Sequence, residues 1–251
     1  MEQAQQAIIL IANVKPAARR AGFACNFTQG ARANPCKIRG LPPDRRLIAE
    51  NRPLNPTTLK LEIAATAAAL IVEEGLEYGP AKHRAVKQMA LPGRTELPGN
   101  AEVEDAVHEY IALFCADTQP AELAALRELA VTWMARMAAF RPYLGGAVWH
   151  GTATRLSDIY IQLFCDDPKS AEIALIDHQV DYEPRTVTGF TGGRVEALSL
   201  SSFCQGLNEP VGVHLMVYDH DDLRGALRAD PKGRKPRGDL ADVQKLLAAA
   251  P

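Results

Sequence analysis

A run of small residues that ends in Ser-Asp has the composition of a ligand-binding turn. It lies within positions 144–167, which read LGGAVWHGTATRLSDIYIQLFCDD. Glycines allow the backbone to approach a ligand closely, and the N–H groups of such a turn can bind phosphate. The residues that could shape this turn and contact a nucleotide are Gly145, Gly146, Gly151, Thr152, Arg155 and Ser157. Among them, Arg155 could pair with a phosphate oxygen.

The residues after Ser157 alternate between two faces, as in a half-buried strand. Ile159, Ile161 and Leu163 share one face, and Asp158, Tyr160, Gln162 and Phe164 share the other. Residues two apart on a strand point the same way, so Asp158 and Tyr160 are expected side by side.

This stretch resembles the signature of the DNA polymerase β-like nucleotidyltransferase superfamily. In that signature a Gly-Ser pair is followed by a glycine and, seven residues later, by the first Asp of an Asp-x-Asp motif. Gly151 and Asp158 keep this spacing, whereas Gly146-Ala147 stands where Gly-Ser is expected. Tyr160 stands in place of the second Asp. Residues 120–220 carry the resemblance. Within the superfamily, the chain is most similar to a set of bacterial proteins with a helical front half and a degenerate strand motif.

The resemblance implies a metal-dependent site. In the superfamily, two carboxylates at i and i+2 hold two Mg²⁺ ions against a nucleoside triphosphate, and a neighbouring strand supplies a third carboxylate. The corresponding catalytic positions here are Asp158, Tyr160 and His214, with Glu196 as a weaker candidate for the third. Asp158 would be the metal ligand, for Mg²⁺ or Mn²⁺, because histidine is a poor ligand for Mg²⁺.

Two functions follow from the resemblance. The first is an enzyme that transfers a nucleoside monophosphate from a triphosphate to an acceptor, such as RNA or a protein. The alternative is a catalytically inactive protein that binds a nucleotide or RNA on the same fold. Whether the protein is an enzyme stays open at this stage. The chain has neither a GxxxxGK[ST] phosphate loop nor the GxSxG motif of serine hydrolases.

Composition places the chain among ordinary globular proteins, with 47% hydrophobic residues and a net charge of −2. The net charge produces no overall electrostatic attraction to nucleic acid, so only a local basic patch could bind it. The longest apolar runs are too short to span a bilayer, and residues 7–12 lack the flanks of a secretory signal. We therefore expect a cytoplasmic protein with no membrane contact. Five scattered cysteines are expected to be reduced, and the histidines lack zinc-site spacing.

Three parts differ in composition. Residues 1–57 are basic and rich in proline, and we expect a disordered arm there; an arm that binds nucleic acid is the alternative. Residues 58–118 are expected to form a helical section, and residues 119–251 a nucleotidyltransferase-like domain. The fold class is therefore α/β (α+β): a small mixed sheet flanked by helices, preceded by an all-helical section.

Hydrophobic periodicity predicts the elements of both sections. Helices are expected over 59–74, 81–89, 100–114, 121–140, 168–178 and 239–249, with a short one from Asp221. Strands are expected over 158–164, 182–190, 194–203 and 211–218. Pro184 indicates an edge position for its strand, because proline cannot donate to a sheet ladder. The loop 232–237 is basic and could contact phosphate, although a solvated loop is the simpler interpretation.

Overall fold

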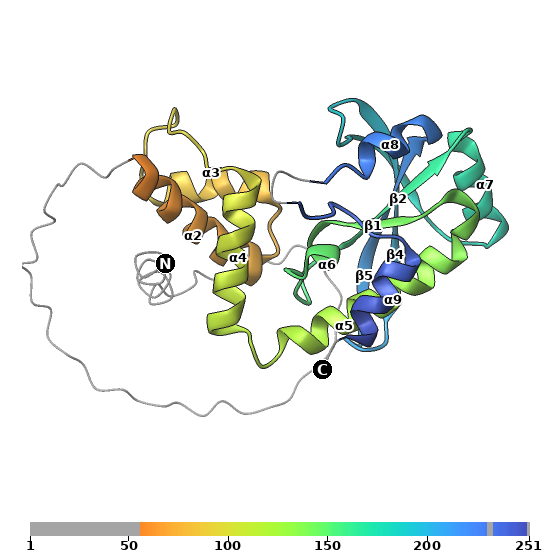
Figure 1. The fold of residues 1–251 in the computed structure, drawn as a ribbon, viewed down its shortest axis with the longest axis horizontal. Helices are drawn as coiled ribbons and strands as arrows, with labels where there is room; N and C mark the ends of the chain where they lie inside the picture. Colours follow the sequence, from red (N-terminus) through yellow and green to blue (C-terminus); the bar gives the residue numbers. More distant parts are fainter. Residues whose placement is uncertain (1–55, 230–232, 250–251) are drawn as a thin grey trace, which may run out of the picture.

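The structure is a computed structural model of the 251-residue chain, and it describes residues 56–229 and 233–249. The expected basic arm, residues 1–57, lies almost entirely outside the described residues. The described chain forms a helical section and a sheet section, seen in Figure 1 to the left and to the right. No helix among the described residues is long and apolar enough to cross a membrane.

The helical section has three helices around one core. They are α2 (Pro56–Glu74), α3 (Tyr78–Gln88) and α4 (Asn100–Phe114). The apolar stripe predicted for α2 is buried, with Ile63 and Ala67 fully inaccessible against Val103 and Val107 of α4. Many core positions of α2 are alanines, so the helices can approach each other closely. Asn100 is the first residue of α4, as the predicted range 100–114 has it. The N-terminal cap is Gly99, whose N–H donates to Glu102 over 2.6 Å.

The sheet section is a mixed five-stranded sheet flanked by helices, which confirms the expected fold class. The strands are β1 (Tyr143–Gly145), β2 (Ile159–Cys165), β3 (Glu183–Thr188), β4 (Arg194–Cys204) and β5 (Glu209–Asp219). Their order is β1-β2-β5-β4-β3; β2 and β5 are parallel, and the other pairs are antiparallel. β3, which contains Pro184, lies at an edge as predicted.

Helices connect and flank these strands. They are α5 (Gln119–Arg136), α6 (Gly146–His150), α7 (Pro168–Asp177), α8 (Leu223–Ala226) and α9 (Leu240–Ala248), with short 3₁₀ turns at Ala138–Phe140 and His220–Asp222. The expected helix 121–140 therefore ends earlier, and its last residues form a 3₁₀ turn.

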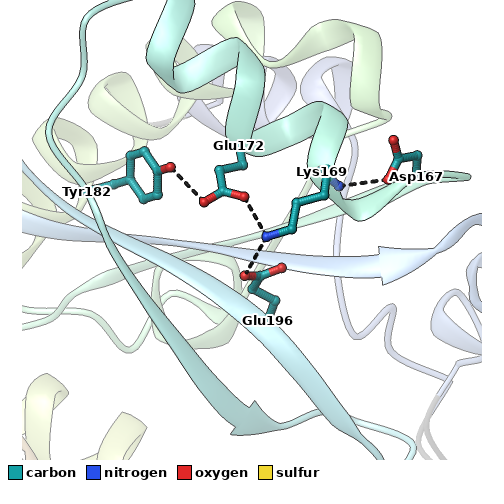
Figure 2. A network of polar contacts seen from close by, with 5 residues as sticks. All are labelled: Asp167, Lys169, Glu172, Tyr182 and Glu196. Carbon is teal, nitrogen blue, oxygen red and sulfur yellow. Dashed lines mark hydrogen bonds and ion pairs between the residues drawn. The ribbon is translucent and has the colours of Figure 1, made fainter.

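One face of the sheet is covered by α5, α7 and α9. The apolar residues of β2, namely Ile159, Ile161 and Leu163, are fully buried on this side, as the alternating pattern predicted. Hydrogen bonds also join this helical layer to the sheet. Trp133 of α5 donates its Nε1–H to the hydroxyl of Ser202 on β4 over 3.0 Å. Figure 2 shows how Lys169 of α7 joins Glu172 and Glu196 above the sheet.

The opposite face carries the polar residues of β2 and is covered only in part. Phe164 and Tyr218 pack with Ala226 of α8 at one end of this face. At the other end, Asp158 and Tyr160 face the helical section. The sheet therefore has an apolar side for packing and a polar end that is available for a site.

The two sections meet at a few specific contacts. Gly75 has φ +69°, and a β-carbon at this position would lie only 3.1 Å from the β-carbon of Leu156 in the sheet section. Glu104 of α4 is buried and pairs with His150 at 2.9 Å and with Arg234 at 3.3 Å. The space between these contacts forms the candidate site.

The stretch 143–150 was expected to be only a turn, and that expectation is wrong. It forms β1 and the five-residue α6. β1 is three residues long, so no alternation could reveal it. It exists because it pairs with β2 on one side and exchanges two backbone hydrogen bonds with Gly238 on the other, at 2.8 and 3.0 Å.

Candidate functional site

A cavity of about 450 Å³ lies between the helical section and the polar end of β2. Its volume is in the range of small-molecule sites. The residues that line it are Ile71, Gly75, Leu76, Glu77, Tyr78, Asn100, Glu104, Gly146, Ala147, His150, Leu156, Ser157, Asp158 and Tyr160. Four residues predicted from the sequence are among them: Gly146, Ser157, Asp158 and Tyr160.

Asp158 is held at the mouth of β2 by β5. Its Oδ2 lies 3.2 Å from Nε2 of His214, and its side chain is about half exposed. The pKa of Asp158 is lowered, first because His214 hydrogen-bonds the carboxylate, and to a smaller extent by the N–H of Gly212, while burial opposes both. The expectation that His214 faces Asp158 from the neighbouring strand is confirmed.

His214 has fixed hydrogen-bond partners on both ring nitrogens. Its Nδ1 lies 2.9 Å from the hydroxyl of Ser199 on β4. Because a carboxylate can only accept, Nε2 carries a proton toward Asp158, while the hydroxyl of Ser199 can either donate to Nδ1 or accept from it. The ring also stacks on Tyr160, its register partner on β2, with 4.8 Å between centroids. These contacts hold the orientation of Asp158.

Tyr160 is the residue that stands where the resemblance leads us to expect a second carboxylate. Its hydroxyl donates to Oε1 of Glu77, just before α3, over 2.9 Å. The pKa of Tyr160 is raised well above its usual value, first by burial and then by the hydrogen bond to Glu77. The side chain is therefore a neutral phenol at neutral pH, and it brings a carboxylate from the helical section to the cavity.

Gly145 and Gly146, the first two glycines of the predicted site, lie beside β2. Gly145 is the register partner of Tyr160. Gly146 has φ +66°, in the left-handed region that favours glycine, and a β-carbon there would lie 3.6 Å from the Tyr160 ring. Ser157 lines the cavity, but its hydroxyl accepts the N–H of Thr154 over 3.0 Å.

The remaining predicted residues lie outside the cavity. Gly151 ends α6 in a left-handed conformation, and its carbonyl accepts from Gln119 of α5. Thr152 is buried. The guanidinium of Arg155 pairs with Glu209 at 2.9 Å, so its charge is neutralised within the protein. Gly151 and Arg155 thus have structural partners in place of the expected phosphate.

The other acidic candidates also point elsewhere. Glu196, the weaker candidate for the third carboxylate, lies 3.7 Å from Lys169 on the α7 side of the sheet, as Figure 2 shows. Asp167 caps α7 by accepting the N–H of Lys169 over 3.0 Å. Neither residue contributes to the cavity.

The cavity is acidic. Glu77, Glu104 and Asp158 line it, and none of its lining residues is a lysine or an arginine. Each carboxylate has a protein partner: Tyr160 for Glu77, His150 for Glu104 and His214 for Asp158. The described residues include no group of three or more His, Cys, Asp or Glu side chains that could hold a metal ion. This donor set does not fit the paired-ion centre of the superfamily, and a Mg²⁺ or Mn²⁺ ion at Asp158 stays a prediction.

Sequence reasoning missed several residues of the site because they come from distant elements. Glu77 and Glu104 lie in the helical section, and Ser199 lies on a strand with no unusual pattern. Gly212 gave a signal, since a glycine inside an alternating strand marks close approach of another group. Comparisons with known protein families, with curated proteins and with solved structures gave no match. The site is therefore interpreted from its own geometry.

Proposed function

We propose that this protein binds a nucleotide on a nucleotidyltransferase-like fold, with the nucleoside part in the cavity between the helical section and β2, and that it lacks a paired-ion transfer centre. The observation that carries the proposal is the position of Tyr160. It fills the place of the second carboxylate, and its hydroxyl is engaged by Glu77.

The chemistry of the cavity wall supports a nucleoside. Ile71, Leu76 and Leu156 give an apolar wall, and Tyr78 adds an aromatic ring on which a base can stack. Carboxylates that line a nucleotide site can accept hydrogen bonds from ribose hydroxyls. Glu77 and Asp158 are suited to that role, because a carboxylate can accept more hydrogen bonds than their protein partners donate.

The rival function is nucleotidyl transfer with a single metal ligand. It is favoured by the half-exposed carboxylate of Asp158, which lines the same cavity as Gly146 at the start of α6. Incubation with α-labelled nucleoside triphosphates, Mn²⁺ or Mg²⁺, and total RNA or protein separates the two functions. Label transfer that disappears in Asp158→Ala would support the enzyme. Saturable binding without transfer would support the proposal.

A matched pair of carboxylate variants tests the site. Glu77→Gln and Asp158→Asn should each weaken nucleotide binding by about tenfold, since a hydrogen bond to a charged group contributes about 1.5–3 kcal/mol. Glu209→Gln is the control, because this carboxylate pairs with Arg155 outside the cavity. The proposal would be overturned if the parent protein bound none of the four common nucleoside triphosphates saturably.

A further inference from the structure

Arg237 is a buried cation on the polar side of the sheet. Its side chain is only 7% exposed, and it lies just before α9. One terminal nitrogen donates to Oε1 of Gln162 on β2, and the guanidinium lies 4.4 Å above the ring of Phe190. Its Nε is fully buried and has no hydrogen-bond partner in the described part of the chain.

No carboxylate of the described residues pairs with this guanidinium, whereas the neighbouring basic side chains have acidic partners. Arg234 pairs with Glu104, and Lys235 pairs with Asp242 at 3.0 Å. Burial lowers the pKa of Arg237, and a charge interaction with Tyr218 opposes this shift to a smaller extent. A buried charge without a counter-ion is costly. The arrangement therefore lacks an anion.

The group next to Arg237 also offers donors. Because Oε1 of Gln162 accepts from Arg237, the other end of its amide is the NH₂ group. A β-carbon on Gly145 would lie 3.6 Å from that nitrogen, so the amide nitrogen lies beside the end of β1. Guanidinium and amide N–H groups are donors that match the oxygens of a phosphate.

We propose that Arg237 and Gln162 form an oxyanion site, which binds a phosphate group of the nucleotide held in the cavity. The identity of the ligand rests on the proposed function; the oxyanion site itself does not. Gln162 lies on the same face of β2 as Asp158 and about 13 Å further along the strand. The phosphate is thereby kept away from the carboxylates of the cavity, where it would be repelled.

The test uses pyrophosphate as the probe and thermal unfolding as the readout. The full-length protein should unfold at a higher temperature in pyrophosphate than in sodium chloride of the same ionic strength and pH. In Arg237→Met the pyrophosphate effect should disappear, while the unfolding temperature in chloride should stay equal or rise, because an unpaired buried charge is replaced by an apolar chain. Arg224→Met, on the exposed surface of α8, is the control and should keep the pyrophosphate effect.

A second variant keeps the test decisive if Arg237→Met folds poorly. Gln162→Glu places a carboxylate beside the guanidinium and supplies the counter-ion from within the protein. It should raise the unfolding temperature in chloride and remove the response to pyrophosphate. A parent protein that pyrophosphate does not stabilise beyond chloride, or a Gln162→Glu variant that keeps the full response, would overturn the oxyanion site.

Nucleotide binding separates this inference from the function on which it rests. A nucleoside triphosphate should bind Arg237→Met at least tenfold more weakly than the parent, while the matching nucleoside should bind both equally. Equal triphosphate affinity in both would refute the role of Arg237 and leave the proposed function in place. Pyrophosphate stabilisation without any nucleoside or nucleotide binding would refute the proposed function and leave the oxyanion site.

Discussion

Gly212 makes room for the carboxylate of Asp158. A β-carbon at position 212 would lie 2.5 Å from Oδ1 of Asp158, closer than real contacts allow. The same glycine donates its backbone N–H to that carboxylate. The position of Asp158 therefore depends on the missing side chain of a residue on the adjacent strand.

Gly212→Ala should displace Asp158 from His214 and weaken nucleotide binding. The added methyl group overpacks a tight site, which typically costs about 1–3 kcal/mol of unfolding free energy. Urea unfolding and nucleotide titration of the variant measure both effects. Gly225→Ala is the control, because a β-carbon there meets nothing within 4 Å. An unchanged affinity for nucleotide in Gly212→Ala would contradict the role assigned to the Asp158 position.

Tyr160→Phe should lower the unfolding free energy by about 1 kcal/mol, since it removes one hydrogen bond, to Glu77. Tyr160→Asp instead adds a carboxylate about 7 Å along the strand from Asp158. We expect this variant to be less stable alone, because the new charge lies near Glu77, and to be stabilised by Mn²⁺. Thermal unfolding with and without Mn²⁺ decides, with Tyr160→Phe as the control. A Tyr160→Asp melt that Mn²⁺ leaves unchanged would count against a latent metal site.

The stability of the protein should depend on pH through Asp158. Its pKa is lower in the folded chain than the ordinary 3.8, so the folded state favours the charged form. The resulting stabilisation is fully present above the ordinary value and is lost as the pH falls through the lowered one. The unfolding free energies of the parent and of Asp158→Asn, measured with urea, should differ most above about pH 5 and converge as the pH falls through the lowered pKa. A difference that grows on acidification would contradict the assigned direction.

Gly238→Ala should be strongly destabilising. A β-carbon at this position would overlap the ring of Trp149, whose Nε1 donates to the carbonyl of Lys235 over 2.8 Å. The ring cannot move without breaking that bond, and Gly238 itself is tied to Leu144 of β1. We expect a loss of about 3 kcal/mol, at the upper end for overpacking, measured by urea unfolding. Gly193→Ala, in an open turn, should change the stability little.

Removal of residues 1–56 should leave the unfolding temperature unchanged. The core of the helical section is made by described residues such as Ile63, Val107 and Tyr110. The truncated protein should therefore stay soluble and show the melt of the full chain. Insolubility, or a melt far below that of the parent, would show that the first residues belong to the core.

Much of the fold was readable from local patterns. Hydrophobic periodicity predicts the strand at 159–165 and the long helices. The end of α2 before Gly75 and the edge position of the strand with Pro184 follow from the backbone properties of glycine and proline. β1 and α6 were missed because three and five residues are too few to show a period. Their stability comes from β2, Gly238 and α5, which sequence spacing does not place.

The site was predicted only in part, for the same reason. The sequence placed Asp158, Tyr160 and His214 together correctly, because the alternation of apolar and polar residues indicates which residues of each strand share a face. Arg155 was misplaced, because nothing local indicates that Glu209 would neutralise it. Arg237 was one charge in a basic loop, and only the packed structure separates it from Arg234 and Lys235, by its burial and by the lack of an acidic partner among the described residues.

The strand order has a consequence for synthesis. The contacts of α2, α3 and α4 are local, so this section can fold as soon as it leaves the ribosome. β2 must wait for β5, which follows only after α7, β3 and β4, and the free edge of β1 stays open until Gly238 is made. The cavity needs both sections. A nascent chain therefore exposes the acidic wall of the helical section long before the opposite wall exists, and only the nearly finished protein can capture a ligand.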